Sequence, residues 1–127
     1  MSMGPRIPAI TQKQVAAFLK PRSRDSHKGQ LGKVVVIGGA SGMVGASLLA
    51  ARAALTLGAG SVHAGLLADN SPVVDVLQPE LMLHRADDAL QLSNPSVVAI
   101  GCGMGQHLEA QKILYEALKL DTALVLD

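Results

Sequence analysis

The sequence predicts an α/β fold of three layers, in which helices cover both faces of a mostly parallel sheet. Short apolar runs alternate with segments of helical periodicity, which is typical of crossover units between parallel strands. Two of these runs, residues 34–37 and 97–100, are apolar at every position, as expected for strands that are covered on both faces. Each of the two is followed at once by a glycine-rich turn.

The N-terminal segment, residues 1–25, is predicted to hold one short helix and a polar loop. Thr11 and Gln14 have the spacing of a capping box, and Pro21 ends the helix. We expect Val15, Phe18 and Leu19 to form its apolar face. The polar loop continues without periodicity up to the first strand.

The first strand, residues 34–37, leads through the turn 38–45 into an alanine-rich helix over residues 46–57. This helix is apolar on nearly all sides, so we expect it to be buried, either within the fold or against another subunit. Gly58 stands at the position that commonly ends a helix.

The remaining elements continue the alternation. The chain ends on a strand that no helix covers, so we expect a domain that is incomplete at its C-terminal end. Residues 1–127 are then the N-terminal part of a single domain. Strands are predicted over residues 61–67, 81–84, 96–100 and 123–126, helices over 86–92 and 106–119, and a short helix or turn over 71–77.

The composition narrows the class of protein. Aromatic residues make up only 2% of the chain, so the core must be aliphatic. The net charge of +1, without a broad basic patch, argues against a nucleic-acid partner. A single cysteine, Cys102, fits a reducing cytoplasm. No apolar run approaches the ~20 residues of a membrane span, so we predict a cytoplasmic protein with no membrane partner.

The two glycine-rich turns, residues 38–45 and 101–105, are predicted to lie at the same edge of the sheet. Ligands bind at the carboxyl ends of parallel strands, and a helix N-terminus favours phosphate. We therefore predict a nucleotide or another phosphorylated ligand here. Neither turn has the spacing of a dinucleotide fingerprint or of a P-loop. The candidate contacts in the turns are Gly39, Gly42, Gly45 and Gly105.

Other side chains carry weaker signals. Asp69 stands near the place of the acidic residue in a dinucleotide site, but the residues after it favour a helix cap. Asp127 ends a strand and either faces a metal-bound phosphate or a substrate, or is an ordinary loop carboxylate. The four histidines lack metal-ligand spacing and are expected on the surface or in loops. His27 is the exception that we single out as a candidate functional residue, because Lys28 and Gly29 follow it just before the first strand. Cys102 is interpreted as a small space-filling residue.

Several blocks of the sequence, in the same order, resemble the ADP-dependent NAD(P)H-hydrate dehydratase family. The second turn departs from the family pattern, which usually has proline where Cys102 stands and leucine where Met104 stands. The blocks are residues 26–33, 38–46, 52–60, 78–82, 99–105 and 125–127.

The resemblance implies a ribokinase-like fold and a repair activity. Hydrated NADH or NADPH (NADHX or NADPHX) is dehydrated to the working cofactor, while ADP gives AMP and phosphate; Mg²⁺ is expected with the nucleotide. Ala46 and Gly103 match family residues that contact the hydrated nicotinamide nucleotide. The family's ADP-binding residues and catalytic aspartate correspond to positions beyond Asp127. The resemblance therefore implies no catalytic residue in this chain, and we expect the chain to be inactive alone.

Two other functions stay open. The protein is alternatively a small-molecule kinase of the same fold, acting on a sugar or a vitamin precursor, or a non-catalytic nucleotide-binding module. We also expect a homo-oligomer, because apolar residues on both faces of the helix 46–57 favour a subunit contact. Alternatively, the rest of the domain covers this apolar surface and the protein is a monomer. Leu48 and Leu55 then either face a partner or belong to the core.

Overall fold

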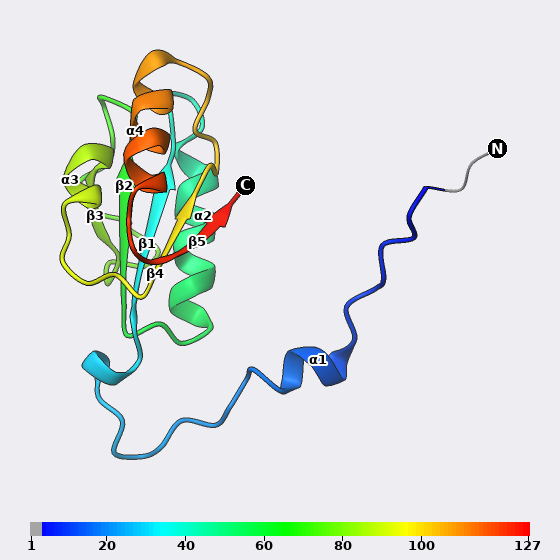
Figure 1. Ribbon diagram of the computed structural model, residues 1–127. Helices are drawn as coiled ribbons and strands as arrows, with labels where there is room; N and C mark the ends of the chain where they lie inside the picture. Colours follow the sequence, from blue (N-terminus) through cyan, green and yellow to red (C-terminus); the bar gives the residue numbers. More distant parts are fainter. Residues whose placement is uncertain (1–3) are drawn as a thin grey trace.

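The computed structural model describes residues 4–127 and shows a five-stranded sheet with helices on both faces (Figure 1). All neighbouring strands pair in parallel, in the order β3-β2-β1-β4-β5. The predicted α/β class and the parallel sheet are therefore confirmed, and each predicted strand lies within two residues of the observed one. The strands are β1 (Lys33–Gly38), β2 (Ser61–Leu66), β3 (Met82–Arg85), β4 (Val97–Ile100) and β5 (Ala123–Leu126).

The helices divide between the two faces of this sheet. The helix α2 (Val44–Thr56) packs on β1 and β2 from one side. On the other side, α3 (Ala86–Leu90) packs against β1, β2 and β3, and α4 (Leu108–Leu118) packs against β4. Figure 1 shows α2 behind the sheet and α3 and α4 on the opposite side. The predicted three layers are confirmed.

The chain changes direction across the sheet at β1. From β1 it passes through α2 to β2 on one side, and from β3 it passes through α3 to β4 on the other side. In open parallel sheets, such a reversal of strand order leaves a crevice at the carboxyl ends of the two central strands, and ligands bind there. The turns after β1 and β4 are the two glycine-rich segments of the sequence analysis.

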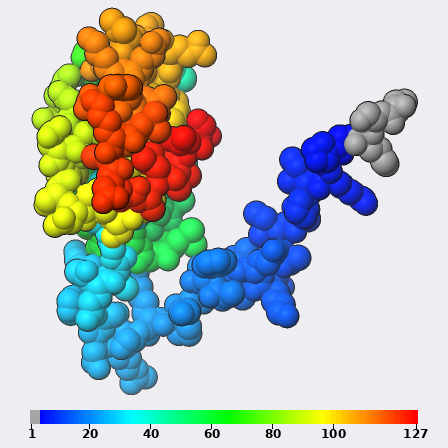
Figure 2. Space-filling view, in the orientation of Figure 1, coloured from blue at the N-terminus to red at the C-terminus, as the bar shows by residue number. Residues whose placement is uncertain are grey.

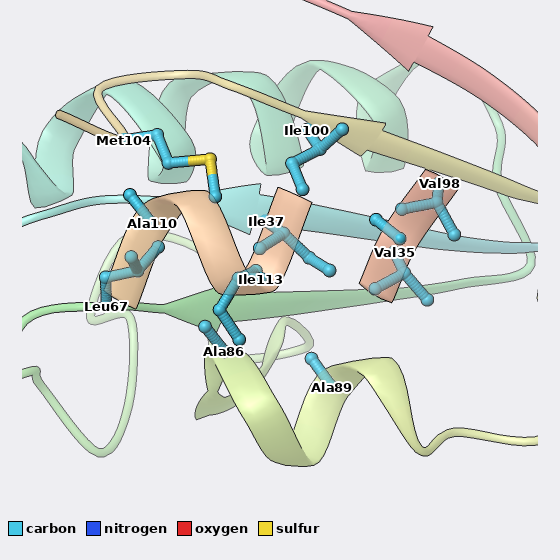
Figure 3. Close-up of a cluster of buried hydrophobic side chains, with 11 residues drawn as sticks. Val35, Ile37, Leu67, Ala86, Ala89, Val98, Ile100, Met104, Ala110 and Ile113 are labelled. Carbon is cyan, nitrogen blue, oxygen red and sulfur yellow. The ribbon is translucent and has the colours of Figure 1, made fainter. Parts of the chain in front are cut away.

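Side chains that alternate along β1 divide the core into two clusters. Val35 and Ile37 point toward α3 and α4, whereas Val36 points toward α2. Figure 3 shows the first cluster, in which side chains of strands, helices and the second glycine-rich turn point toward one another. Burial on both faces explains why β1 is apolar at every predicted position. The first cluster holds Val35, Ile37, Leu67, Ala86, Ala89, Val98, Ile100, Met104, Ala110, Ile113 and Ala117.

The N-terminal segment extends away from this core as an arm (Figures 1 and 2). Its helix α1 (Gln12–Ala16) begins with the predicted capping box of Thr11 and Gln14. The predicted apolar face, however, is not buried: Val15 is 45%, Phe18 87% and Leu19 56% exposed. A short 3-10 helix, Lys28–Gln30, then leads into β1. Residues 1–3 of the predicted N-terminal segment lie outside the described part of the chain.

The helices α2 and α4 present faces that differ from those predicted by helical spacing. That spacing places an apolar face of α2 at Ala46, Leu49, Ala50, Ala53, Ala54 and Leu57, and one of α4 at Leu108, Ile113, Leu114, Ala117 and Leu118. In α2, Ser47 and Ala51 are buried and Leu55 packs against the core, whereas Leu49 is 65% exposed. In α4, the buried residues are Ala110, Ile113 and Ala117, while Leu108, Leu114 and Leu118 are exposed. Small residues face the sheet in both helices, because alanine and serine allow a helix to approach closely. The predicted faces were therefore wrong in part.

The segment 71–77 is irregular, so the turn alternative was right and the helix alternative was wrong. No helix in residues 4–127 combines the length and the apolar character that crossing a membrane requires.

Candidate functional site

The two glycine-rich turns are joined by backbone hydrogen bonds at the carboxyl ends of β1 and β4. The N–H of Gly39 donates to the carbonyl of Cys102 at 3.0 Å, and the N–H of Ala40 donates to the carbonyl of Gly103 at 2.8 Å. As predicted, both turns lie at one edge of the sheet. The same hydrogen bonds close the space directly between the turns, so a ligand must lie beside them rather than between them.

Glycine serves two different purposes in these turns. Gly103 has a φ of +61°, and a Cβ atom there would lie 2.7 Å from the carbonyl oxygen of Met43 and 2.9 Å from the Cβ of Ala46. A Cβ on Gly39 would lie 2.8 Å from the Cδ2 of Leu66. These two glycines let protein segments pack closely.

The other candidate glycines lie in more open surroundings. A Cβ on Gly42 or Gly45 would meet no heavy atom within 4 Å. On Gly105 it would make only ordinary contacts, the nearest at 3.6 Å. Ala46 is exposed in the first turn of α2. Gly42, Gly45, Ala46 and Gly105 therefore remain accessible to a ligand, and their role as contacts stays a prediction.

Ser47 connects α2 to both turns. It is fully buried, and its Oγ donates to the carbonyl of Cys102 at 2.9 Å. The same carbonyl accepts the N–H of Gly39. Sequence reasoning missed this residue, although a polar position in the first turn of the otherwise apolar start of α2 was a usable signal. Cys102 itself is half-buried and contributes its backbone to the junction, in keeping with the interpretation of a small space-filling residue.

Two adjoining cavities open beside the turns at this edge of the sheet. The smaller has a volume of about 150 Å³ and is bounded by both turns and by the start of α4. The larger, of about 280 Å³, lies toward β3 and shares Ala68 and Asp69 with the smaller one. We call the two together the trough. The smaller cavity is lined by Ala40, Ser41, Leu67, Ala68, Asp69, Met104, His107 and Glu109. The larger is lined by Ala68, Asp69, Ser71, Pro72, Val73, Leu83, His84 and Arg85.

The charged side chains of the trough centre on Arg85. Its guanidinium lies 3.9 Å from Asp69, 3.5 Å from Asp87 and 4.0 Å from Glu109. Exposed pairs at such distances contribute little to stability. Because three carboxylates surround one guanidinium, Arg85 offers little net positive charge to a phosphate. The N-terminus of α2, whose cap Met43 makes no side-chain hydrogen bond, is the better place for an anion in this part of the molecule.

The donor set of the described residues does not fit a magnesium site. Residues 4–127 contain no group of three or more acidic, histidine or cysteine side chains arranged to hold a metal ion. The carboxylates at the trough have Arg85, rather than a cluster of further metal ligands, as their charged neighbour. We assign no Mg²⁺ ligand to residues 4–127.

Asp69 and Asp127 have different surroundings. Asp69 caps no helix, since the segment after it is irregular; the interpretation as a cap was wrong. Its side chain is 95% exposed and lines both cavities of the trough. Asp127 lies at the end of β5, where its N–H donates to the carbonyl of Ile100 and its backbone lies close to Gly101.

The histidines were predicted to lie on the surface or in loops, and this was wrong for His63. It lies on β2, is 8% exposed, and its Nδ1 is 2.9 Å from the Nε2 of His84 on β3. The two rings are stacked. Burial, followed by the neighbouring His84 and Lys33, lowers the pKa of His63. His84 and His107 each line one cavity of the trough, while His27 is exposed before β1.

Comparisons with known proteins agree on one family. A family model described as NAD(P)H-hydrate dehydratase matches residues 34–127. The chain is 43% identical over 119 residues to the bifunctional NAD(P)H-hydrate repair enzyme of Coxiella burnetii, covering 91% of this chain and 24% of that protein. It is 44% identical over 87 residues to the ADP-dependent (S)-NAD(P)H-hydrate dehydratase of Neisseria meningitidis, covering 68% of this chain and 29% of that protein.

Solved structures show the same likeness. The ADP/ATP-dependent NAD(P)H-hydrate dehydratase of Bacillus subtilis, co-crystallised with ATP and Mg²⁺, superimposes with a TM-score of 0.79 at 29% identity. A ribokinase-like superfamily protein of Enterococcus faecalis superimposes with a TM-score of 0.70 at 27% identity. The match to the Bacillus subtilis protein includes 98% of this chain and 47% of that protein. The match to the Enterococcus faecalis protein includes 84% of this chain and 40% of that protein.

Proposed function

Because the chain belongs to the NAD(P)H-hydrate dehydratase family, we propose that it supplies part of the substrate site of an enzyme that dehydrates NADHX and NADPHX. The observation that carries this proposal is the junction of Ala46 with Gly103. These two residues, which the family resemblance assigns to the substrate, come from the start of α2 and from the turn after β4, and they lie close together. Met104, the residue after Gly103, lines the smaller cavity of the trough. The proposed reaction consumes ADP and yields NADH or NADPH together with AMP and phosphate.

The reaction needs a good leaving group on the hydrated nicotinamide ring. Hydroxide leaves poorly, whereas a hydroxyl that has received a phosphoryl group leaves as phosphate, and its departure restores the conjugated dihydropyridine. This chain would contribute binding and orientation of the substrate. In this proposal, the exposed Ala46 and Met104, which lines the smaller cavity, would make apolar contacts to the ring, and the N-terminus of α2 would favour a substrate phosphate.

The phosphoryl-transfer half of the site is proposed to lie outside this chain. In a protein of the relatives' length, we expect the residues that hold ADP and Mg²⁺, together with the catalytic aspartate, to follow Asp127. The 127-residue chain alone is then expected to give no ADP-dependent turnover.

The direct test is an assay of a gene product extended to the length of the relatives. It is incubated with NADHX and ADP, and NADH and AMP are quantified. Formation of both in equal amounts supports the proposal. Phosphorylation of a sugar or an alcohol, with NADHX unchanged, would instead select the kinase of the same fold. Binding of nucleotide without any turnover would select the non-catalytic module. Turnover by the 127-residue chain itself would contradict the division of the site.

A further inference from the structure

Among the ion pairs of residues 4–127, the pair of Arg52 and Asp75 is the one with a buried carboxylate, and it joins α2 to the connection between β2 and β3. The Nε of Arg52 lies 2.7 Å from Oδ2 of Asp75, and the second guanidinium nitrogen, NH2, lies 2.7 Å from Oδ1. Oδ1 also accepts the N–H of Leu77 at 3.4 Å. Asp75 is 3% exposed and is the one buried carboxylate among residues 4–127.

This bidentate geometry keeps both groups charged. The side-chain hydrogen bonds from Arg52 lower the pKa of Asp75 below its ordinary 3.8, and the same bonds raise the pKa of Arg52. A carboxylate with a depressed pKa contributes stability that is present above the unfolded pKa and is lost only as the pH falls through the lower folded value. The pair is therefore intact at neutral and mildly acidic pH.

Asp75 lies within an unusual connection. Residues 67–81 join β2 to β3 over 15 residues without a helix or strand, in a place where a crossover helix is common. Irregular connections of about 12–15 residues or more in compact domains are often functional. Side chains within two positions of Asp75 are exposed; Val73 is 94% and Val76 is 83% exposed. In this part of the connection, the ion pair is the main attachment to the body of the protein.

The same connection forms the outer wall of the larger cavity of the trough. It supplies five of the residues that line this cavity, and Val73, the last of them, stands two positions before Asp75. The N–H groups of Leu67 and Ala68 attach the start of the connection to the carbonyls of Gly38 and Gly39. Beyond this start, the ion pair of Asp75 with Arg52 attaches the part of the connection next to Val73 to α2. The five wall residues are Ala68, Asp69, Ser71, Pro72 and Val73.

We propose that Arg52 and Asp75 are positioning residues of the dinucleotide site, because their ion pair holds the connection 67–81 against α2 and fixes the wall of the trough. Neither residue touches the ligand in this account. The identity of the ligand rests on the function proposed above, whereas the attachment of the wall rests only on the ion pair.

The first experiment measures amide hydrogen exchange in the 127-residue chain without ligand. Asp75→Asn removes the negative charge at unchanged side-chain size. Arg52→Lys keeps a positive charge but loses the planar guanidinium that bonds both oxygens of Asp75. Glu116→Gln is the matched control, since it breaks an exposed ion pair of the same 2.7 Å length on α4. We expect exchange in residues 67–81 to rise by about tenfold in Asp75→Asn, and by less in Arg52→Lys, with β1 and α4 unchanged. Unchanged exchange in 67–81, or a rise throughout the chain, would overturn the proposal.

The second experiment measures the dissociation constant for NADPHX by calorimetry. Asp75→Asn should bind about tenfold more weakly than the unchanged chain, with Arg52→Lys in between and Glu116→Gln unaltered. Arg52→Lys leaves Asp75 a cationic partner, so it keeps the test open if Asp75→Asn does not fold. Faster exchange of the connection with an unaltered dissociation constant would refute the positioning role alone. If the unchanged chain does not bind NADPHX, this result counts against the proposed function. It also contradicts the positioning role, because there is then no bound ligand for the wall of the trough to position.

Discussion

A Cβ atom placed on Gly103 would lie 2.9 Å from the Cβ of Ala46. The start of α2 and the turn after β4 therefore approach so closely that only glycine fits at this position. The contact brings together, across the junction of β1 and β4, the two residues that the family resemblance assigns to the substrate.

This contact predicts the effect of the change Gly103→Ala. The added methyl group meets both Met43 and Ala46, and the positive φ of +61° disfavours any side chain. We expect a loss of about 1–3 kcal/mol in the free energy of unfolding, measured by urea denaturation. Gly45→Ala is the control, because Gly45 lies inside α2 with open space around it and alanine favours a helix. Equal losses in both variants would contradict the packing role of Gly103.

Ser47 gives a second prediction for the same junction. In Ser47→Ala, the buried hydrogen bond to the carbonyl of Cys102 is lost, but this carbonyl keeps the N–H of Gly39 as a partner. We expect the free energy of unfolding to fall by about 1 kcal/mol. Thermal unfolding followed by circular dichroism is the measurement. An unchanged midpoint would show that the hydroxyl is not needed to hold α2 against the turns.

His63 predicts how stability depends on pH. Its pKa is lowered in the folded state, so below the ordinary value of 6.5 the unfolded chain binds a proton that the folded chain resists. His63 therefore lowers the free energy of unfolding only below about pH 6.5, and the loss grows as the pH falls toward the lower pKa of the folded state. We expect the urea midpoint to fall between about pH 7.5 and 5.5 in the unchanged chain, and to fall less in His63→Phe. His107→Asn, at an exposed position, should retain the full pH dependence; equal slopes in all three chains would contradict the assignment.

Self-association stays a prediction, and the fold changes the residues that test it. For Leu48 and Leu55, a contact with a partner and a place in the core were both left open; Leu55 packs, partly buried, against the core, whereas Leu49 and Leu57 are exposed. If α2 contacts another subunit, Leu49→Glu should dissociate the assembly in sedimentation experiments and leave the unfolding midpoint unchanged. Leu55→Glu should instead lower the unfolding midpoint, because it places an unpaired carboxylate against an apolar cluster. A concentration-independent monomer before any substitution would contradict the expected contact.

The regular elements could be predicted because their signals are local. Residues 34–37 and 97–100 are apolar at every position and directly followed by glycine, and both are central strands. Thr11 and Gln14 form the predicted capping box. The placement of both turns at one edge then follows from parallel pairing alone. These patterns extend over a few residues, so a single sequence contains them.

The long-range partners could not be predicted in this way. Arg52 and Asp75 are 23 positions apart and lie in segments without a common period. His63 is a single polar residue in a buried strand, and its hydrogen-bonding partner comes from a neighbouring strand whose register is set by the whole sheet. The predicted apolar face of α4 was wrong in part because Ala110 and Ala117, rather than larger residues, face the sheet.

The central claim is that the two glycine-rich turns form part of a site for hydrated nicotinamide nucleotides. Its most direct test is a titration of the isotope-labelled 127-residue chain with NADPHX, in which the amide chemical shifts are measured by NMR at each step. We predict that the shifts concentrate in the first turn and the start of α2, at Gly42, Gly45 and Ala46, and in the second turn at Gly103 and Gly105. Shifts confined to the opposite edge of the sheet, around residues 28–33, or no shifts at all, would contradict the account.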